Sequence, residues 1–139
     1  MVEADRERIF AEARDVLLAA LPRALALYVY GSFARGDEWP QSDLDLAVLL
    51  PADQDIPDLL GLIGEISTHT GRDVDLVDLR KAGDVLRREV LEAGRVLHTA
   101  DPDSVLAWEA SAMSRYARHR EEVREILEDF ERTGTGFAR

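Results

Sequence analysis

The stretch that decides the fold is Ala24-Leu25-Ala26-Leu27-Tyr28-Val29-Tyr30-Gly31-Ser32, an apolar and partly β-rich run that stops at a turn. Such a run predicts a buried strand that ends at Gly31. A second apolar run, Asp43 to Leu50, is too short for a solitary helix and is stopped by Pro51. A polar loop separates the two runs, so we expect two strands that pair as a hairpin-like unit.

Helical periodicity flanks these two strands. Between residues 3 and 20, apolar residues recur at spacings of three and four, which predicts an amphipathic helix. Asp55 as N-cap and Pro57 in the first turn predict a second helix that ends at Gly71. The remaining expected elements are a strand over 74–79, a helix over 82–93, a short strand over 95–98 and a long helix from Asp101 to near Gly134. This order predicts an α/β (α+β) fold, a small sheet flanked by helices, with a long C-terminal helix.

Length and composition favour one domain with its own core. The chain has 139 residues, 46% of them hydrophobic, and no cysteine. We expect a single domain over residues 1–139, with a core of about 3–100 and a C-terminal helix of about 101–133. Without a signal peptide or a membrane-spanning run, a soluble cytoplasmic protein is expected. The formal net charge of −11 disfavours direct nucleic-acid binding but not a basic protein partner.

Two aspartates at the start of the second strand carry the chemistry. Alternation along a strand places Asp43 and Asp45 on one face, a few ångströms apart. Such close carboxylates repel one another unless a cation sits between them, and Mg²⁺ prefers oxygen ligands. An isolated Asp-x-Asp is more often the start of a solvated strand, so the pair gains its meaning from its surroundings.

Those surroundings are a Gly-Ser turn and an arginine. Gly31 and Ser32 follow the first strand, where backbone amides and a hydroxyl can hold phosphate oxygens. Arg35, one short loop away, can neutralise the same phosphates. Each feature alone is more often an ordinary turn or a solvated side chain. Together with Ser42, which precedes the acidic pair, they form the predicted nucleotide-binding set: Gly31, Ser32, Arg35 and Ser42.

The combined pattern resembles a known family. Gly-Ser-x-Ala-Arg-Gly over 31–36 followed by Ser-Asp-x-Asp-Leu over 42–46 is similar to the signature of polymerase-β-type nucleotidyltransferases. The match is closest to the small MNT branch, the antitoxins of HEPN/MNT toxin-antitoxin pairs. The resemblance implies a polymerase-β-like fold with a mixed sheet, a Gly-Ser pair that binds triphosphate, and Asp43 and Asp45 as metal ligands.

The family also uses a third carboxylate from a later strand. Strand parity places Asp73 and Asp75 on one face and Asp78 on the other, which leaves two candidates. Asp75, between Val74 and Leu76, matches the family's apolar-Asp-apolar pattern best, with Asp73 as the alternative ligand. Asp43, Asp45 and Asp75 are therefore the predicted catalytic and metal-binding residues. Three carboxylates fit a scheme with two Mg²⁺ ions, in which Asp75 is the general base or a metal anchor.

The resemblance implies a substrate and a partner. ATP is the expected nucleotide, and the acceptor is a tyrosine hydroxyl of a partner HEPN ribonuclease toxin, which the added AMP neutralises. One alternative is a binding antitoxin with a vestigial nucleotide site. Another is a nucleotidyltransferase for a small molecule such as an aminoglycoside, which the −11 charge would attract.

Other residues give weaker signals. His69, His98 and His119 lie in unrelated elements, so a shared metal or catalytic role is not expected. Trp39, in the loop between the motifs, is suited to stack on a base or touch a partner, and equally to cover nearby apolar surface. It stays outside the predicted site.

Overall fold

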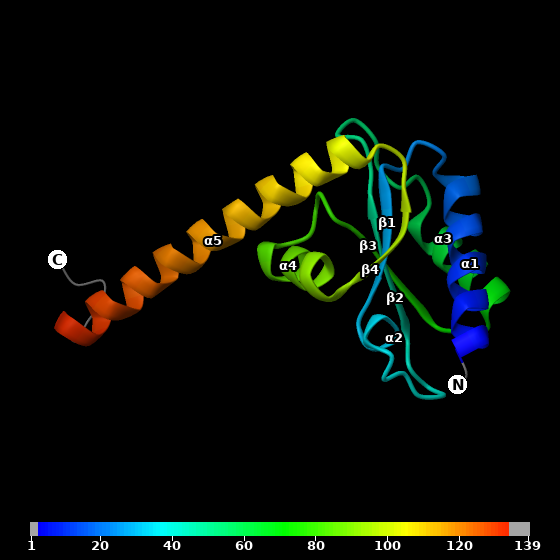
Figure 1. Ribbon diagram of the computed structural model, residues 1–139, viewed down its shortest axis with the longest axis horizontal. Helices are drawn as coiled ribbons and strands as arrows, with labels where there is room; N and C mark the ends of the chain where they lie inside the picture. Colours follow the sequence, from blue (N-terminus) through cyan, green and yellow to red (C-terminus); the bar gives the residue numbers. More distant parts are fainter. Residues whose placement is uncertain (1–2, 134–139) are drawn as a thin grey trace.

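Four strands form one mixed sheet at the centre of the structure (Figure 1). The computed structural model describes residues 3–133. The strand order is β3-β2-β1-β4. The strands are β1 (Ala26–Tyr30), β2 (Leu44–Leu49), β3 (Val74–Asp78) and β4 (Arg95–Thr99).

Helices cover both faces of this sheet. In Figure 1, α1 and α3 lie on one face, and α4 and the beginning of α5 lie on the other. The helices are α1 (Glu3–Ala20), α2 (Ser32–Arg35), α3 (Leu59–Thr70), α4 (Asp84–Ala93) and α5 (Pro102–Thr133). The order of helices and strands confirms the α+β class and the long C-terminal helix expected from the sequence.

The two central strands pair as predicted. β1 runs antiparallel to β2, and Tyr30 lies opposite Asp45. β2 runs parallel to β3, and Asp45 lies opposite Asp75. β4 joins the free edge of β1 in an antiparallel sense. This register places Tyr30, Asp45 and Asp75 in one row across three adjacent strands, at the end of the sheet where β1 ends and β2 begins.

Alternation along the strands divides the apolar residues into two clusters. Toward α1 and α3, strand residues such as Val29, Leu44 and Leu46 pack with the helical residues Ile9 and Leu17. Toward α4 and α5, Tyr28, Ala47 and Leu49 pack with Val90 and Val105. Tyr30 belongs to this second cluster, so the face that carries Asp45 is the one covered by α4 and α5.

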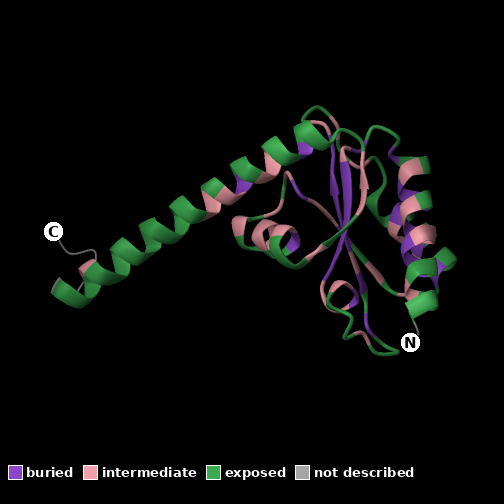
Figure 2. Cartoon of the chain, viewed as in Figure 1, coloured by how far each residue is buried: buried purple, intermediate pink, exposed green. Residues whose placement is uncertain are grey.

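The last helix continues well beyond the sheet (Figure 1). Its first turns pack on the second cluster through Val105 and Trp108, and Tyr28 donates a hydrogen bond of 2.8 Å to Glu109. Further along, Figure 2 shows a mostly exposed helix. Exposed apolar side chains there are Val123, Ile126, Leu127 and Phe130.

Two local predictions need correction. The N-cap of α3 is Asp58, whose carboxylate accepts from the Gly61 amide at 3.0 Å, whereas Asp55 pairs with Lys81. The sequence pattern favoured Asp55 because a proline followed it, yet Pro57 lies before the helix. The predicted loop after Gly31 contains the short helix α2, which has no periodicity long enough to be seen in sequence.

The other boundaries agree to within about two residues. Asp101 precedes α5 as expected and accepts a hydrogen bond of 2.6 Å from the Ser104 hydroxyl. The predicted end of this helix near Gly134 lies outside the described residues. None of the helices described between residues 3 and 133 is apolar enough over a sufficient length to cross a membrane.

Candidate active site

The candidate site lies where β1 ends and β2 begins, on the face of the sheet that α4 covers. Tyr30, Asp45 and Asp75 are neighbours across three adjacent strands. Asp43 precedes β2 by one residue and is exposed, whereas Asp45 is only partly exposed. The site is therefore open to solvent at Asp43 and borders the apolar core at Asp45.

The electrostatics of Asp45 show how crowded this row is. Burial raises the pKa of Asp45 to about 6, helped by the negative charges of Asp75, Asp43 and Glu89. The positive charge of Arg35 acts in the opposite direction and lowers this pKa. A carboxylate flanked by like charges gains most from a bound cation, because the cation stabilises every charge at once.

The Tyr30 hydroxyl is affected by the same negative charges as Asp45. Burial raises the pKa of this hydroxyl, and the charges of Asp75, Asp45 and Glu89 raise it further, together with a hydrogen bond to Asp75. The phenol therefore stays protonated and acts as a donor to the carboxylate.

Position 31 requires a glycine for two reasons, its backbone conformation and the lack of space for a side chain. Its φ of 71° is in the left-handed region that favours glycine. A Cβ built on Gly31 would lie 2.3 Å from an Asp45 carboxylate oxygen, so any side chain would displace that oxygen. The turn thus brings the backbone of the Gly-Ser motif directly against the acidic pair.

The predicted nucleotide-binding residues gather around one cavity. Its volume is about 400 Å³, and it is lined by Gly31, Ser32, Arg35, Trp39, Gln41, Ser42, Asp43, Asp45 and Glu89. Arg35 is half exposed and pairs with Asp37 at 3.3 Å. Ser42 is buried, and its hydroxyl oxygen accepts a hydrogen bond of 2.8 Å from the Trp39 amide. All four predicted residues therefore border the same space.

The structure distinguishes the three later aspartates. Asp75 lies opposite Asp45 and contributes to its raised pKa. Asp73 precedes β3, and its carbonyl accepts from the Leu44 amide at 2.8 Å. Asp78 caps the turn after β3 by accepting from the Arg80 amide at 3.0 Å. The geometry therefore favours Asp75 over Asp73 as the third carboxylate.

Sequence reasoning missed Glu89. It lies on α4, lines the cavity, and its charge raises the pKa of both Asp45 and Tyr30. Glu89 precedes Val90, whose side chain is buried against the sheet, so it stands at the edge of the packed face. That position was a weak signal, because a glutamate at the margin of an amphipathic helix is usually solvated.

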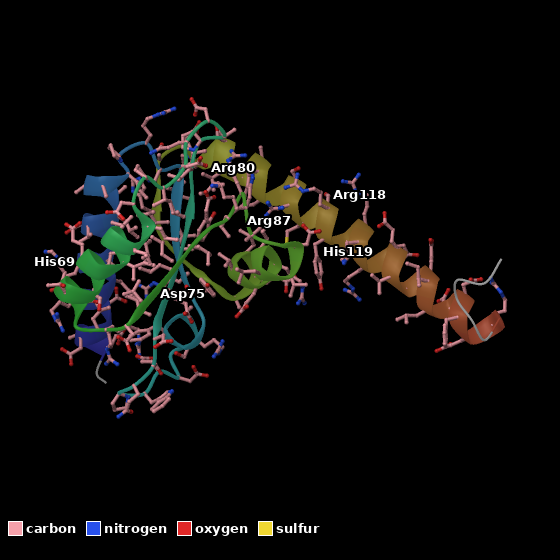
Figure 3. All side chains as sticks on the ribbon, turned by 180° about the vertical axis from the view of Figure 1, so that it is seen from behind. His69, Asp75, Arg80, Arg87, Arg118 and His119 are labelled. Atoms are coloured by element: carbon pink, nitrogen blue, oxygen red, sulfur yellow. The ribbon has the colours of Figure 1, made fainter. Side chains whose placement is uncertain are left out.

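The histidines do not gather at the site. Figure 3 shows His69 on α3 and His119 on α5, on opposite sides of the structure, with Asp75 between them. The His69 ring bonds the Glu65 carbonyl at 2.9 Å, and His98 lies on β4 opposite Leu27. The rings of His69 and His119 therefore do not meet.

Arg80 and Arg87 are also structural. Arg80 donates to the Leu50 carbonyl at 2.6 Å, and Arg87 donates to the Leu79 carbonyl at 2.7 Å. Both guanidinium groups thereby satisfy backbone oxygens where β2 and β3 end, leaving Arg35 as the cation that lines the cavity.

The donor set fits a divalent cation in kind and charge. Among residues 3–133, no three His, Asp or Glu side chains are disposed to hold an ion as a group. However, the mutual repulsion that raises the pKa of Asp45 arises from Asp43 and Asp75, the other two predicted ligands. Carboxylate oxygens are the ligands that Mg²⁺ takes, and those of Asp43 and Asp45 line the cavity beside the Gly31-Ser32 turn.

Comparison with known proteins identifies the family. Residues 16–103 match the family described as "Polymerase beta, Nucleotidyltransferase". The matched region begins in α1, includes the whole sheet and ends at the start of α5. The chain belongs to this nucleotidyltransferase family.

Individual relatives agree with that assignment. The chain is 31% identical over 109 residues to the protein adenylyltransferase MntA of Shewanella oneidensis, covering 78% of each chain. It is 33% identical over 87 residues to a bifunctional uridylyltransferase/uridylyl-removing enzyme of Burkholderia thailandensis, covering 55% of this chain and 10% of that enzyme.

Solved structures share the fold. A toxin-antitoxin structure with AMP-PNP superposes with a TM-score of 0.76 and 29% identity, covering 88% of this chain and 98% of that one. A structure of the tri-AMPylated Shewanella oneidensis HEPN toxin in complex with MNT antitoxin gives a TM-score of 0.72 and 26% identity, covering 91% and 98%. The expected polymerase-β-like fold is thereby confirmed.

Proposed function

We propose that this chain is a Mg²⁺-dependent protein adenylyltransferase that transfers AMP from ATP to a tyrosine of a HEPN ribonuclease toxin. One observation carries the proposal. Asp43 and Asp45 line the same cavity as the Gly31-Ser32 turn, which presses against Asp45, and the register places Asp75 opposite Asp45 on the next strand. This arrangement serves transfer of a nucleotidyl group and is unnecessary for a binding module.

Asp43, Asp45 and Asp75 are the residues that would hold Mg²⁺. When bound, two such ions neutralise triphosphate charge and lower the pKa of an attacking hydroxyl. Three carboxylates that repel one another in the free chain become a favourable cage once the cations are present.

The remaining residues bind and orient the reactants. The Gly31-Ser32 turn offers backbone amides and a hydroxyl to the phosphates, and Arg35 offers a charged fork of donors on the same side of the cavity. The acceptor oxygen attacks the α-phosphorus, the bond to the bridging oxygen breaks, and pyrophosphate leaves. Asp75, held by the Tyr30 hydroxyl, accepts the proton of the acceptor.

The acceptor is proposed from the relatives. MntA is named a protein adenylyltransferase, and an AMPylated HEPN toxin has been seen in complex with its MNT antitoxin. An AMP group on a toxin adds negative charge and bulk, which repels RNA phosphates and blocks their access. The modified toxin would therefore lose its ribonuclease activity.

Transfer of label from α-labelled ATP tests the proposal directly. The assay mixes the chain with a HEPN toxin and Mg²⁺, and compares wild type with the Asp43→Asn/Asp45→Asn variant. We expect a labelled toxin with wild type alone, lost on addition of EDTA. If both forms bind the toxin tightly and neither labels it, the chain is a binding antitoxin. Labelling of a small aminoglycoside without any protein partner would assign the alternative acceptor.

A further inference from the structure

Trp39 stands exposed at the rim of the candidate active site. Its exposed fraction is 59%, and it lines the same cavity as Gly31, Ser32 and Arg35. Phe33, six residues earlier in the same connection, is buried in the core. The connection between the two motifs thus buries one aromatic side chain and presents the other to solvent.

Two contacts fix the backbone at Trp39. Its amide donates to the Ser42 hydroxyl oxygen at 2.8 Å. The Arg72 guanidinium donates to the Trp39 carbonyl at 3.4 Å and to the Pro40 carbonyl at 2.7 Å. The same guanidinium lies 5.3 Å from the centre of the Phe33 ring, so Arg72 ties the loop to the core.

The preceding residue is anchored as firmly. The Glu38 side chain is 1% exposed and accepts a hydrogen bond of 2.6 Å from Arg6 on α1. A buried ion pair on one side of Trp39 and backbone hydrogen bonds on the other leave little freedom to the main chain. The loop therefore holds a large, rigid aromatic surface in water instead of letting it pack onto the protein.

We propose that Trp39 is the stacking surface for the nucleobase of the bound nucleoside triphosphate. This inference rests on the proposed function and adds the residue that binds the base. Phosphates at Gly31, Ser32 and Arg35 place the nucleoside in the same cavity, and Trp39 is the only aromatic residue among those that line it. Stacking on indole needs only a π-face, so Trp39 raises affinity for all four nucleotides and most for the larger purines.

Fluorescence measures this contact without relying on activity. Trp108 is the other tryptophan, and it lies half-buried on α5 against the second apolar cluster. A Trp108→Phe background leaves Trp39 as the sole indole. With Mg²⁺ present, we expect quenching by ATP and GTP, weaker quenching by UTP, and none by inorganic tripolyphosphate. Equal signals from ATP and tripolyphosphate would overturn the inference, because tripolyphosphate has no base.

Calorimetric titration of variants completes the test. Trp39→Ala should weaken ATP binding by about thirtyfold, the middle of the range for loss of one stacked base, and leave tripolyphosphate binding unchanged. Trp39→Phe should restore most of the affinity. Phe130→Ala, which removes a half-exposed aromatic side chain from distal α5, is the matched control and should bind ATP as wild type does.

The outcomes separate the two proposals. If wild type binds no nucleotide, the proposed function and the stacking role both fail. If Trp39→Ala binds ATP as wild type does and still transfers AMP, only the stacking role fails. A Trp39→Ala variant with an unchanged KM for ATP and a raised KM for the acceptor protein would assign Trp39 to acceptor docking and overturn the inference.

Discussion

The paired strands β1 and β2 and the distal half of α5 use apolar residues in opposite ways. Every residue of β1 is buried, and in β2 only Asp45 is partly exposed. From Arg118 onward, nearly every described residue of α5 is exposed, apolar ones included. The first region fixes where the carboxylates lie, whereas the second contributes little to that position.

The difference follows from what each region packs against. Both faces of β1 and β2 are covered by helices, so a shift of one residue would turn Asp45 into the apolar cluster beneath α1 and α3. Distal α5 has no such cover within residues 3–133, and local ion pairs support it instead. Arg124 pairs with Glu121 and Glu128, one turn away on either side.

The largest expected effect is on AMP transfer, which depends on the carboxylates that the strand pair positions. Replacing Asp43 and Asp45 together by asparagine should reduce AMP transfer by at least about a thousandfold, because the phosphates lose their charged metal cage. The unfolding temperature of the metal-free protein should not fall, since the substitution removes repelling charges without changing size. Single-turnover transfer and a thermal melt in EDTA measure the two effects. A variant that melts well below wild type would show a structural loss instead.

A second pair of substitutions contrasts the two regions in stability. Leu46→Ala removes a side chain that is 0% exposed in β2 and should lower the free energy of unfolding by about 2–5 kcal/mol. Leu127→Ala, at a position 58% exposed on α5, should change it by less than about 0.5 kcal/mol. Urea unfolding followed by circular dichroism gives both values. Equal losses would mean that distal α5 packs in solution and is not the exposed element described above.

The motif residues could be predicted to lie together for a physical reason, while their roles stay predictions. Asp43, Asp45, Gly31 and Ser32 stand in a short motif whose geometry follows from strand alternation and one turn. Strand parity alone left Asp73 and Asp75 open, and the flanking Val74 and Leu76 favoured Asp75. The parallel register of β2 and β3, which strand parity does not encode, places Asp75 opposite Asp45. Glu89 required the placement of α4 over the sheet, a long-range packing result.

The local errors have the same origin. The helix α2 has only four residues, too few for a period to be visible. The cap at Asp58 depended on which aspartate reached a free amide, and Asp55 had a competing partner in Lys81. Apolar periodicity predicted the long elements because burial of a whole face leaves few alternatives.

A pH titration of stability measures the crowding of charges around Asp45 in the strand pair. The pKa of Asp45 is about 6 in the fold and near 4 when unfolded, so the folded chain binds more protons between these values. Metal-free wild type should therefore lose stability as pH rises from about 4 to 6, relative to Asp45→Asn. After allowance for solvent screening, the difference should be about 1–2 kcal/mol. Parallel urea curves at several pH values measure it, and a difference independent of pH would refute the crowding of charges.

A modest loss of stability is expected at the junction of the two regions. Tyr28 on β1 donates a hydrogen bond of 2.8 Å to Glu109, near the point where α5 leaves the sheet. Tyr28→Phe removes this donor while keeping the buried ring, and should cost about 1 kcal/mol. Glu109→Gln retains an acceptor and should cost less.

Hydrogen exchange then shows which part of the fold loses protection. Because the bond joins α5 to β1, faster exchange should be confined to the first turns of α5, with β1 and β2 still protected. Loss of protection throughout the sheet would mean that α5 supports the strand pair after all.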